Sequence, residues 1–120
     1  MARILLVEDE PLVAHTVRRI LERAGHEVEW APSGKVALER LEEGAYDLVL
    51  CDLVMPGVSG LEVIRELGRR GGPPVLALSA SVSTRSQEEA LEAGAKGFLG
   101  KPFDAQILLA QVARLLGESA

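Results

Sequence analysis

The chain has little of what marks secreted or membrane proteins. It contains one cysteine, Cys51, so no disulfide can form within the chain, and this thiol lies in an apolar run where buried, unreactive cysteines are common. No apolar stretch approaches the length of a membrane span, and the first apolar run starts close to the amino terminus, which leaves no room for a signal peptide. We therefore expect a cytoplasmic protein with no membrane contact.

The chain also lacks an excess of positive charge and the glycine-rich loops that bind phosphate. The formal net charge of the 120 residues is −5, the opposite sign from that of a domain that neutralises nucleic-acid phosphates through a basic patch. Neither GxGxxG nor GxxxxGK[ST] follows any apolar run. These absences argue against direct nucleic-acid binding and against a nucleotide-binding enzyme.

What the chain does have is the composition and regular pattern of one α/β domain. Its residues are 48% hydrophobic and 26% charged, which suffices for a sizeable core, and no linker or repeat interrupts the chain. Short apolar runs, predicted as buried strands, alternate with one-sided apolar patterns, predicted as helices. The second strand differs, because Val28 alternates with Glu27 and Glu29, which predicts a less deeply buried edge strand. The predicted strands cover residues 4–7, 26–30, 47–51, 75–79 and 97–100. The helical patterns run from Leu12 to Leu21, Val36 to Leu41, Leu61 to Leu67, Thr84 to Ala93 and Ile107 to Leu116, with Ser33, Thr84 and Asp104 as predicted N-caps.

This alternation predicts a doubly wound, mostly parallel sheet with helices on both faces. The reason is that parallel neighbours are joined by right-handed crossovers, and a helix usually makes the crossover. Two strand orders are common in such sheets. In the order 2-1-3-4-5, the first and third strands are neighbours at the point where the strand order reverses.

Charged residues fall at the carboxyl ends of three predicted strands. Glu8 and Asp9 follow the first strand, Asp52 follows the third, and Lys101 follows the fifth. Strand ends of this kind line the ligand crevice of open α/β sheets, so the three acids would meet, with Lys101 and Ser79 arriving from one side. Three crowded carboxylates repel one another and favour a divalent cation, and a nearby ammonium favours a phosphoryl group.

These residues predict phosphoryl chemistry. Asp52 is the candidate nucleophile, because a carboxylate can accept a phosphoryl group as an acyl phosphate and the predicted loop presents it to solvent. Glu8 and Asp9 are candidate ligands of Mg²⁺, which prefers oxygen ligands and often binds one or two carboxylates plus a phosphate. The alternatives are structural: a turn-forming Asp52, acids that complement the dipole of the first helix, and a solvated Lys101.

Four motifs, in order, make the chain resemble the receiver domain of two-component response regulators, a CheY-like family. They are the acidic pair after the first strand, D-x-x-M-P-x-x-x-G from Asp52 to Gly60, a hydroxyl residue followed by alanine at Ser79-Ala80, and Lys101-Pro102 after the fifth strand. The resemblance covers essentially the whole chain. It implies a flavodoxin-like sheet in the order 2-1-3-4-5, one receiver domain over residues 1–120 in single-domain form, and no output domain.

The resemblance also assigns roles within the site. It implies that Asp52 is the phosphoacceptor and that Lys101, after a cis bond to Pro102, and Ser79 act on the phosphoryl group. The implied Mg²⁺ ligands are Glu8, Asp9, Asp52 and the backbone carbonyl of Val54. Val54 and Ser81 occupy positions that tune the lifetime of the acyl phosphate in this family, and a valine cannot orient an attacking water, so we expect slow self-dephosphorylation.

The implied output is a conformational switch. The Ser79 hydroxyl would bond a phosphoryl oxygen, the following loop would move inward, and Phe98 would rotate into the vacated space. The donor would be a histidine kinase or a phosphotransfer protein. The target would be a protein that binds the face formed by the fourth helix, fifth strand and fifth helix, or a second copy of the chain in a phosphorylation-dependent homodimer.

Three functional classes compete at this point. The leading one is a phosphorylation switch that catalyses only its own modification. The second is a degenerate receiver that acts as a phosphorylation-independent scaffold, against which the retained acids and Lys101 argue. The third is a small phosphohydrolase with an aspartyl nucleophile. Such enzymes commonly carry a second acid two residues after the nucleophile, where this chain has Val54.

Overall fold

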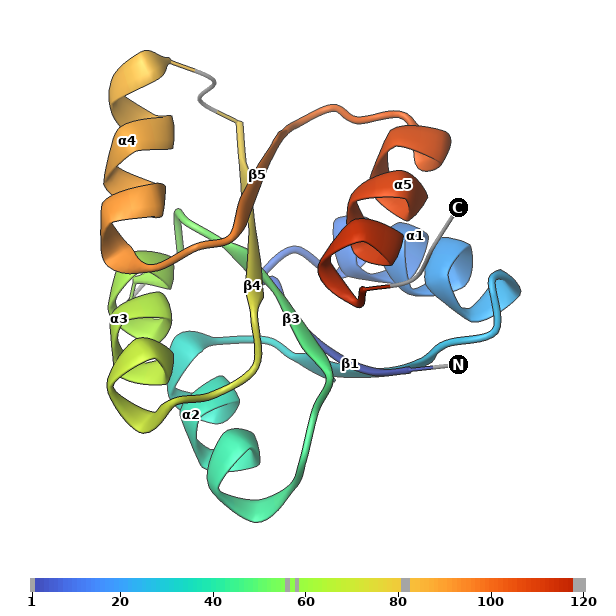
Figure 1. The fold of residues 1–120 in the computed structure, drawn as a ribbon. Coiled ribbons are helices and arrows are strands. Elements are labelled where there is room, and N and C mark those ends of the chain that lie inside the picture. The colour runs from blue at the N-terminus through green and yellow to red at the C-terminus, as the bar shows by residue number, and fades with distance from the viewer. Residues whose placement is uncertain (1, 56, 58, 81–82, 118–120) are drawn as a thin grey trace.

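The computed structural model describes residues 2–55, 57, 59–80 and 83–117. Five strands in these residues pair as one parallel sheet in the order β2-β1-β3-β4-β5, which confirms the predicted topology (Figure 1). The strands are β1 (Arg3–Val7), β2 (Glu27–Ala31), β3 (Leu48–Asp52), β4 (Val75–Ser79) and β5 (Gly97–Gly100). Every residue of β3 and β4 is buried, as expected of parallel strands covered on both faces.

Five helices cover the two faces of the sheet. They are α1 (Pro11–Arg23), α2 (Gly34–Glu43), α3 (Gly60–Arg70), α4 (Thr84–Ala93) and α5 (Ala105–Leu115). Figure 1 shows α1 and α5 on one face and α2, α3 and α4 on the other. Successive residues of a strand point to opposite faces, so Ile4 and Leu6 join the core beneath α1 and α5, whereas Leu5 and Val7 join the core beneath α2 to α4.

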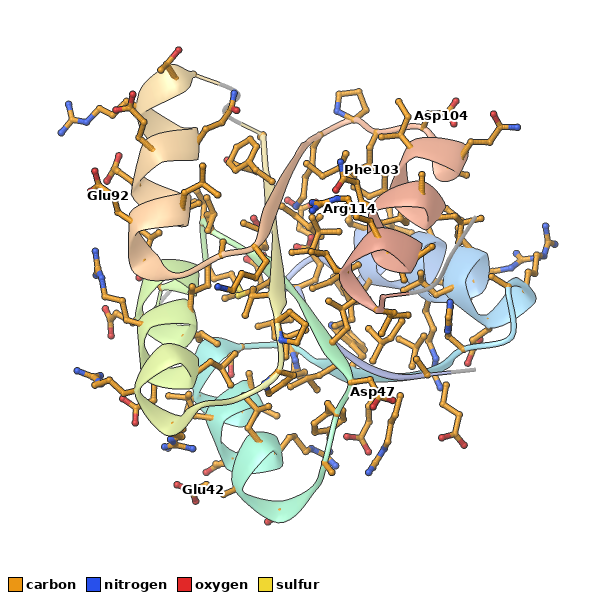
Figure 2. The ribbon with its side chains drawn as sticks, viewed as in Figure 1. Glu42, Asp47, Glu92, Phe103, Asp104 and Arg114 are labelled. Carbon is orange, nitrogen blue, oxygen red and sulfur yellow. The ribbon has the colours of Figure 1, made fainter. Side chains whose placement is uncertain are left out.

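The predicted caps hold at two helices and fail at one. Ser33 caps α2 by accepting a hydrogen bond from the Val36 N–H at 3.2 Å. Asp104, labelled at the start of α5 in Figure 2, accepts from the Gln106 N–H at 2.7 Å. The prediction for Thr84 was wrong by one residue: Ser83 has the extended backbone of an N-cap, and Thr84 is already the first residue of α4.

Some apolar residues that the pattern placed in the core lie on the surface instead. Leu12 is 83% exposed and Ile107 is 53% exposed. An α-helix turns about 100° per residue, so Leu12 points away from the stripe of α1 that includes Ala14 and Val17. In α4 the single buried residue is Ala90, which makes this helix the most lightly embedded of the five. Among the described residues, no helix has the length and apolar character needed to span a membrane.

Candidate phosphoacceptor and metal site

The sheet brings the sequence-predicted residues to one edge. Val7 of β1 is paired with Cys51 of β3, so Glu8 and Asp52 are the next residues along two neighbouring strands. On the other side of β3, Ser79 ends β4 opposite Gly100, and the Lys101 N–H donates to the Ser79 carbonyl at 2.7 Å. The register thereby places Lys101 at the same carboxyl edge as the acids.

Lys101 lies between two carboxylates. Its Nζ donates to Glu8 Oε1 at 2.7 Å and to Asp52 Oδ2 at 3.1 Å. The Lys101-Pro102 peptide bond is cis, as the resemblance implied. Glu8 is fully buried and Asp52 is 5% exposed, so the ammonium compensates charges that water barely reaches.

Three acids form an oxygen-rich cluster with room for a cation. Glu8, Asp9 and Asp52 each offer a carboxylate oxygen, and these oxygens lie within 4.8 Å of one another. Within the described residues, the Asp9 carboxylate has no hydrogen-bond or ion-pair partner. With Lys101 as the one cation among them, the cluster keeps an excess of negative charge. An all-oxygen, anionic donor set of this kind fits Mg²⁺.

The main chain after Asp52 also contacts the acidic cluster. The Val54 N–H donates to Asp52 Oδ1 at 3.3 Å, while the Val54 side chain is 72% exposed. The Val54 carbonyl as a metal ligand stays a prediction. Ser81, at the other position expected to tune the acyl phosphate, lies outside the described residues.

Burial and hydrogen bonding have opposite effects on the pKa values of Glu8 and Lys101. Burial raises the pKa of Glu8, and this effect outweighs the hydrogen bonds from Lys101 and from the Glu10 N–H. For Lys101, burial acts to lower the pKa, but the hydrogen bonds to Glu8 and Asp52 outweigh it and raise the pKa. Burial also raises the pKa of Cys51, which agrees with the interpretation of this thiol as an unreactive part of the core.

The expectation that a loop presents Asp52 to solvent was wrong. Asp52 is the last residue of β3 and is buried, because α3 begins directly behind it and Lys101 lies over its carboxylate. A Cβ built on Gly60, the first residue of α3, would lie 2.1 Å from the Asp52 carbonyl oxygen. The glycine that ends the D-x-x-M-P-x-x-x-G motif is therefore required for this close approach.

Ser79 and Phe98 lie on β4 and β5, the two strands beyond β3 in the sheet. Ser79 is buried at the end of β4, and Phe98, on β5, is half-buried against the core beneath α2, α3 and α4. The switch roles of both residues stay predictions.

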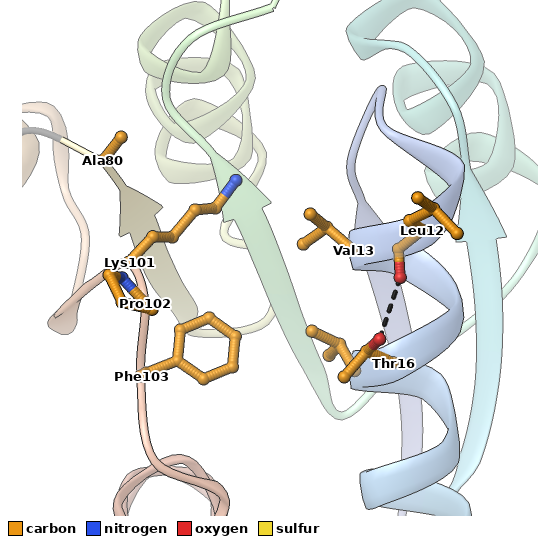
Figure 3. Close-up of a pocket in the computed structure, with 8 residues that line it drawn as sticks. Leu12, Val13, Thr16, Ala80, Lys101, Pro102 and Phe103 are labelled. Carbon is orange, nitrogen blue, oxygen red and sulfur yellow. Dashed lines mark hydrogen bonds between the residues drawn. The ribbon is translucent and has the colours of Figure 1, made fainter.

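An apolar groove beside Lys101 was missed by the sequence reasoning. Its volume is about 490 Å³. Three segments line it: α1 contributes Leu12, Val13, Thr16 and Val17, and facing them are Ala80, which follows β4, and Lys101, Pro102 and Phe103, which follow β5 (Figure 3). Figure 3 shows the Phe103 ring opposite α1 and the Lys101 side chain running along the groove toward the end of β3. The available signal was Leu12, a large apolar residue off the buried stripe of its helix.

This fold and site define an α/β domain with an acidic, lysine-containing pocket at the carboxyl edge of a 2-1-3-4-5 sheet. The sequence model of the response regulator receiver domain matches residues 4–113. The chain therefore belongs to the response regulator receiver domain family, a family of signalling domains.

Relatives and solved structures agree with this assignment. The chain is 40% identical over 119 residues to the two-component response regulator PhoP of Pseudomonas aeruginosa, covering 98% of the chain and 53% of PhoP. It is 41% identical over 113 residues to the aerobic respiration control sensor protein ArcB of Escherichia coli, covering 91% of the chain and 14% of ArcB. The structure of the response regulator TrrA of Thermotoga maritima, in complex with Mg²⁺-BeF, matches with a TM-score of 0.87 and 35% identity, over 96% of the chain and 99% of TrrA. The chain thus spans about half the length of regulators such as PhoP.

Proposed function

We propose that this receiver domain is a phosphorylation switch whose phosphoacceptor is Asp52. The observation that carries the proposal is the position of Lys101, whose Nζ lies within 3.1 Å of Asp52 Oδ2 and also contacts Glu8 beside a cluster of acidic oxygens. A lysine and a cation site that converge on one carboxylate fit phosphoryl transfer, which depends on positioning and charge neutralisation.

In the proposed step, an Asp52 carboxylate oxygen attacks the phosphorus of a phosphohistidine. The new O–P bond forms as the N–P bond breaks, and the electron pair of the N–P bond stays on the imidazole nitrogen of the donor. The Lys101 ammonium pairs with a phosphoryl oxygen and in this way gives up its contact with Asp52. When bound to Glu8, Asp9, Asp52 and the Val54 carbonyl, Mg²⁺ would supply further neutralisation of the phosphoryl charge.

We place the donor over the groove between α1 and the segment that follows Lys101. Asp52 is too buried to meet a bulky donor elsewhere, and Leu12 and Phe103 offer apolar surface directly beside the ammonium. The similarity to ArcB, a sensor protein, and to response regulators supports a histidine kinase or a phosphotransfer protein as the donor.

The test is an intact-mass measurement after incubation with acetyl phosphate and Mg²⁺. We expect the parent to gain one phosphoryl group, and we expect neither Asp52→Asn nor the parent in excess chelator to gain it. Asp104→Asn, which alters an exposed acid at the cap of α5, is the matched control and should be modified like the parent. An unmodified parent would favour the scaffold, and multiple turnover of small phosphate esters would favour the hydrolase.

The proposed output is a change of packing around Phe98 that alters the face formed by α4, β5 and α5. With beryllofluoride as the phosphate mimic, backbone NMR signals of these elements should shift in the parent. Phe98→Ala should reduce those shifts while signals near Asp52 still respond. Leu91→Ala, which truncates an exposed residue of α4, is the control. Undiminished shifts in α4 of Phe98→Ala would contradict the role of Phe98.

A further inference from the structure

Trp30 links the edge strand β2 to the acidic cluster. It is the only tryptophan in the sequence, and it pairs in register with Leu6 of β1. The ring packs partly buried against the core beneath α1 and α5. Its Nε1–H reaches past Leu6 and donates to the Glu8 backbone carbonyl at 2.7 Å. The donor atom of Trp30 therefore contacts the backbone of a candidate metal ligand.

The end of β2 supplies partners for both backbone polar groups of Glu8. The Glu8 N–H donates to the Ala31 carbonyl at 3.1 Å, and the Glu8 carbonyl accepts from Trp30. The two oxygens of its carboxylate are bound separately, by the Glu10 N–H at 3.2 Å and by Lys101. The peptide that joins Glu8 to Asp9 is therefore fixed from the β2 side, away from the pocket.

The turn after β1 needs such a restraint. It carries three consecutive acids, Glu8, Asp9 and Glu10, whose like charges repel one another. Glu10 is the N-cap of α1, and its side chain makes no capping hydrogen bond. The start of the helix is instead restrained by the Glu8 carboxylate, which accepts from the Glu10 N–H, so the position of the turn depends on how Glu8 is held. An indole donates a strong hydrogen bond without bringing positive charge. A lysine or arginine in its place would neutralise the acids that attract the cation.

We propose that Trp30 is a positioning residue for cation binding. Through the Glu8 carbonyl it sets the orientation of the Glu8–Asp9 peptide, and so keeps both carboxylates directed toward the pocket. Groups that hydrogen-bond to a metal ligand, without touching the metal, commonly control metal affinity by orienting that ligand. The inference rests on the proposed function, because it concerns the cation site of the same pocket.

The test removes the N–H and keeps the ring. Because the sequence has one tryptophan, benzothienylalanine, in which sulfur replaces the indole N–H, can be placed at position 30 alone. We expect the dissociation constant for Mn²⁺, measured by electron paramagnetic resonance with Mg²⁺ as competitor, to increase about threefold to tenfold, as the loss of one hydrogen bond predicts. Trp30→Phe should show the same direction of change.

Two controls separate positioning from stability. A protein with 5-fluorotryptophan at position 30 retains the N–H and should bind Mn²⁺ like the parent. Val28→Ala removes buried surface from β2 without touching Glu8, so it should lower the free energy of unfolding and leave the Mn²⁺ affinity unchanged.

The outcomes distinguish this inference from the function on which it rests. If the parent binds Mn²⁺ and is phosphorylated, but the benzothienylalanine protein binds Mn²⁺ as tightly as the parent, the positioning role alone is overturned. If neither Mn²⁺ nor Mg²⁺ binds the parent more tightly than it binds Asp52→Asn, the cation site of the proposed function fails and the role of Trp30 fails with it.

Discussion

At the scale of the residue, Lys101 is the internal counter-ion of the pocket. One ammonium contacts two buried carboxylates, and each of these would be costly to bury alone. The third acid, Asp9, keeps its carboxylate outside this pairing. Lys101 therefore offsets part of the cost of burying Glu8 and Asp52, while the pocket retains a negative charge that a cation can neutralise.

Val54 is an exposed apolar side chain two residues after Asp52, the proposed phosphoacceptor. It cannot orient a water molecule for attack on an acyl phosphate, so the phosphorylated protein should persist. In Val54→Asn, an amide that orients this water through one hydrogen bond of about 1 kcal/mol should speed dephosphorylation about fivefold. The rate is measured as loss of the phosphorylated mass after removal of acetyl phosphate. A Val54→Asn protein that loses phosphate no faster than the parent would contradict the expectation.

Tyr46 provides a pH-dependent signal away from the pocket. Its hydroxyl donates to Glu29, and the Arg3 guanidinium carbon lies 4.8 Å from the centroid of its ring. Burial, together with Glu29, raises the pKa of Tyr46 to about 12. The folded state thus favours the protonated phenol, so this stabilisation is complete below about pH 10 and is lost as the pH rises through about 12.

Ultraviolet absorbance of tyrosinate measures this directly, because the sequence has one tyrosine. The native protein should titrate with a midpoint near 12. The urea-unfolded chain should titrate near 10, the ordinary value for a tyrosine. Coincident midpoints in the two states would show that Glu29 does not bind the hydroxyl in solution.

At the scale of the element, alanine substitutions at two glycines of α3 should change the stability of the protein in opposite directions. A Cβ at Gly60 would collide with the Asp52 carbonyl, so Gly60→Ala should destabilise the protein by about 1–3 kcal/mol and disturb phosphorylation. A Cβ at Gly68, in the interior of the same helix, meets nothing within 4 Å. Gly68→Ala should therefore stabilise the protein by about 0.5–1 kcal/mol. Urea unfolding measures both changes, and equal effects of the two substitutions would refute the close approach of α3 to β3.

The elements themselves were largely predictable, because the inner strands are short apolar runs, β2 alternates polar and apolar residues as an edge strand does, and each helix has a one-sided pattern. Two strands, β2 and β3, were predicted one residue too early, since hydrogen bonding rather than hydropathy decides where a strand ends. Leu12 was misplaced because apolar character alone does not identify the face of a helix. The burial of Asp52 was missed because it depends on Gly60 and Lys101, which arrive from other elements.

At the scale of the whole molecule, the site could be predicted because topology does most of the assembly. Once the order of the parallel strands is fixed, every strand end falls at the same edge, and residues as distant as Glu8 and Lys101 come into contact. The groove beside Lys101 and the hydrogen bond from Trp30 to Glu8 could not be predicted in this way. They depend on the angles at which side chains leave α1, β2 and the segment after β5, and no sequence pattern encodes these angles.

The charge of the pocket should link metal binding to the stability of the entire fold. The Asp9 carboxylate lies within 4.8 Å of oxygens of Glu8 and Asp52, two acids that share the single ammonium of Lys101. One uncompensated negative charge at about 5 Å would cost Asp9 about 3 kcal/mol at an effective dielectric constant of 20, before screening. Its interaction with the dipole of α1 returns at most about 1 kcal/mol. Asp9→Asn should therefore stabilise the metal-free protein by about 1 kcal/mol or more.

When Mg²⁺ is present, the parent should instead be more stable than Asp9→Asn. A concentration ten times the dissociation constant adds about 1.4 kcal/mol to the stability of the parent, and Asp9→Asn should lose most of that gain. Thermal unfolding with and without Mg²⁺ measures both arms, and Glu39→Gln, which removes an exposed acid of α2, controls for overall charge. A parent whose melting temperature ignores Mg²⁺ would contradict the linkage.

The light embedding of α4 sets the size of signal that the molecule can transmit. One phosphoryl group offers a small number of charge-assisted hydrogen bonds, each of about 1.5–3 kcal/mol. Detaching α1 from the sheet would expose Ala14, Val17 and Leu21, which costs more than such hydrogen bonds supply, whereas in α4 only Ala90 is fully buried and Ala93 packs partly buried beside it. Of the five helices, α4 is therefore the one that we expect phosphorylation to reposition. Its amide protons should be among the first helical ones to exchange with deuterated solvent.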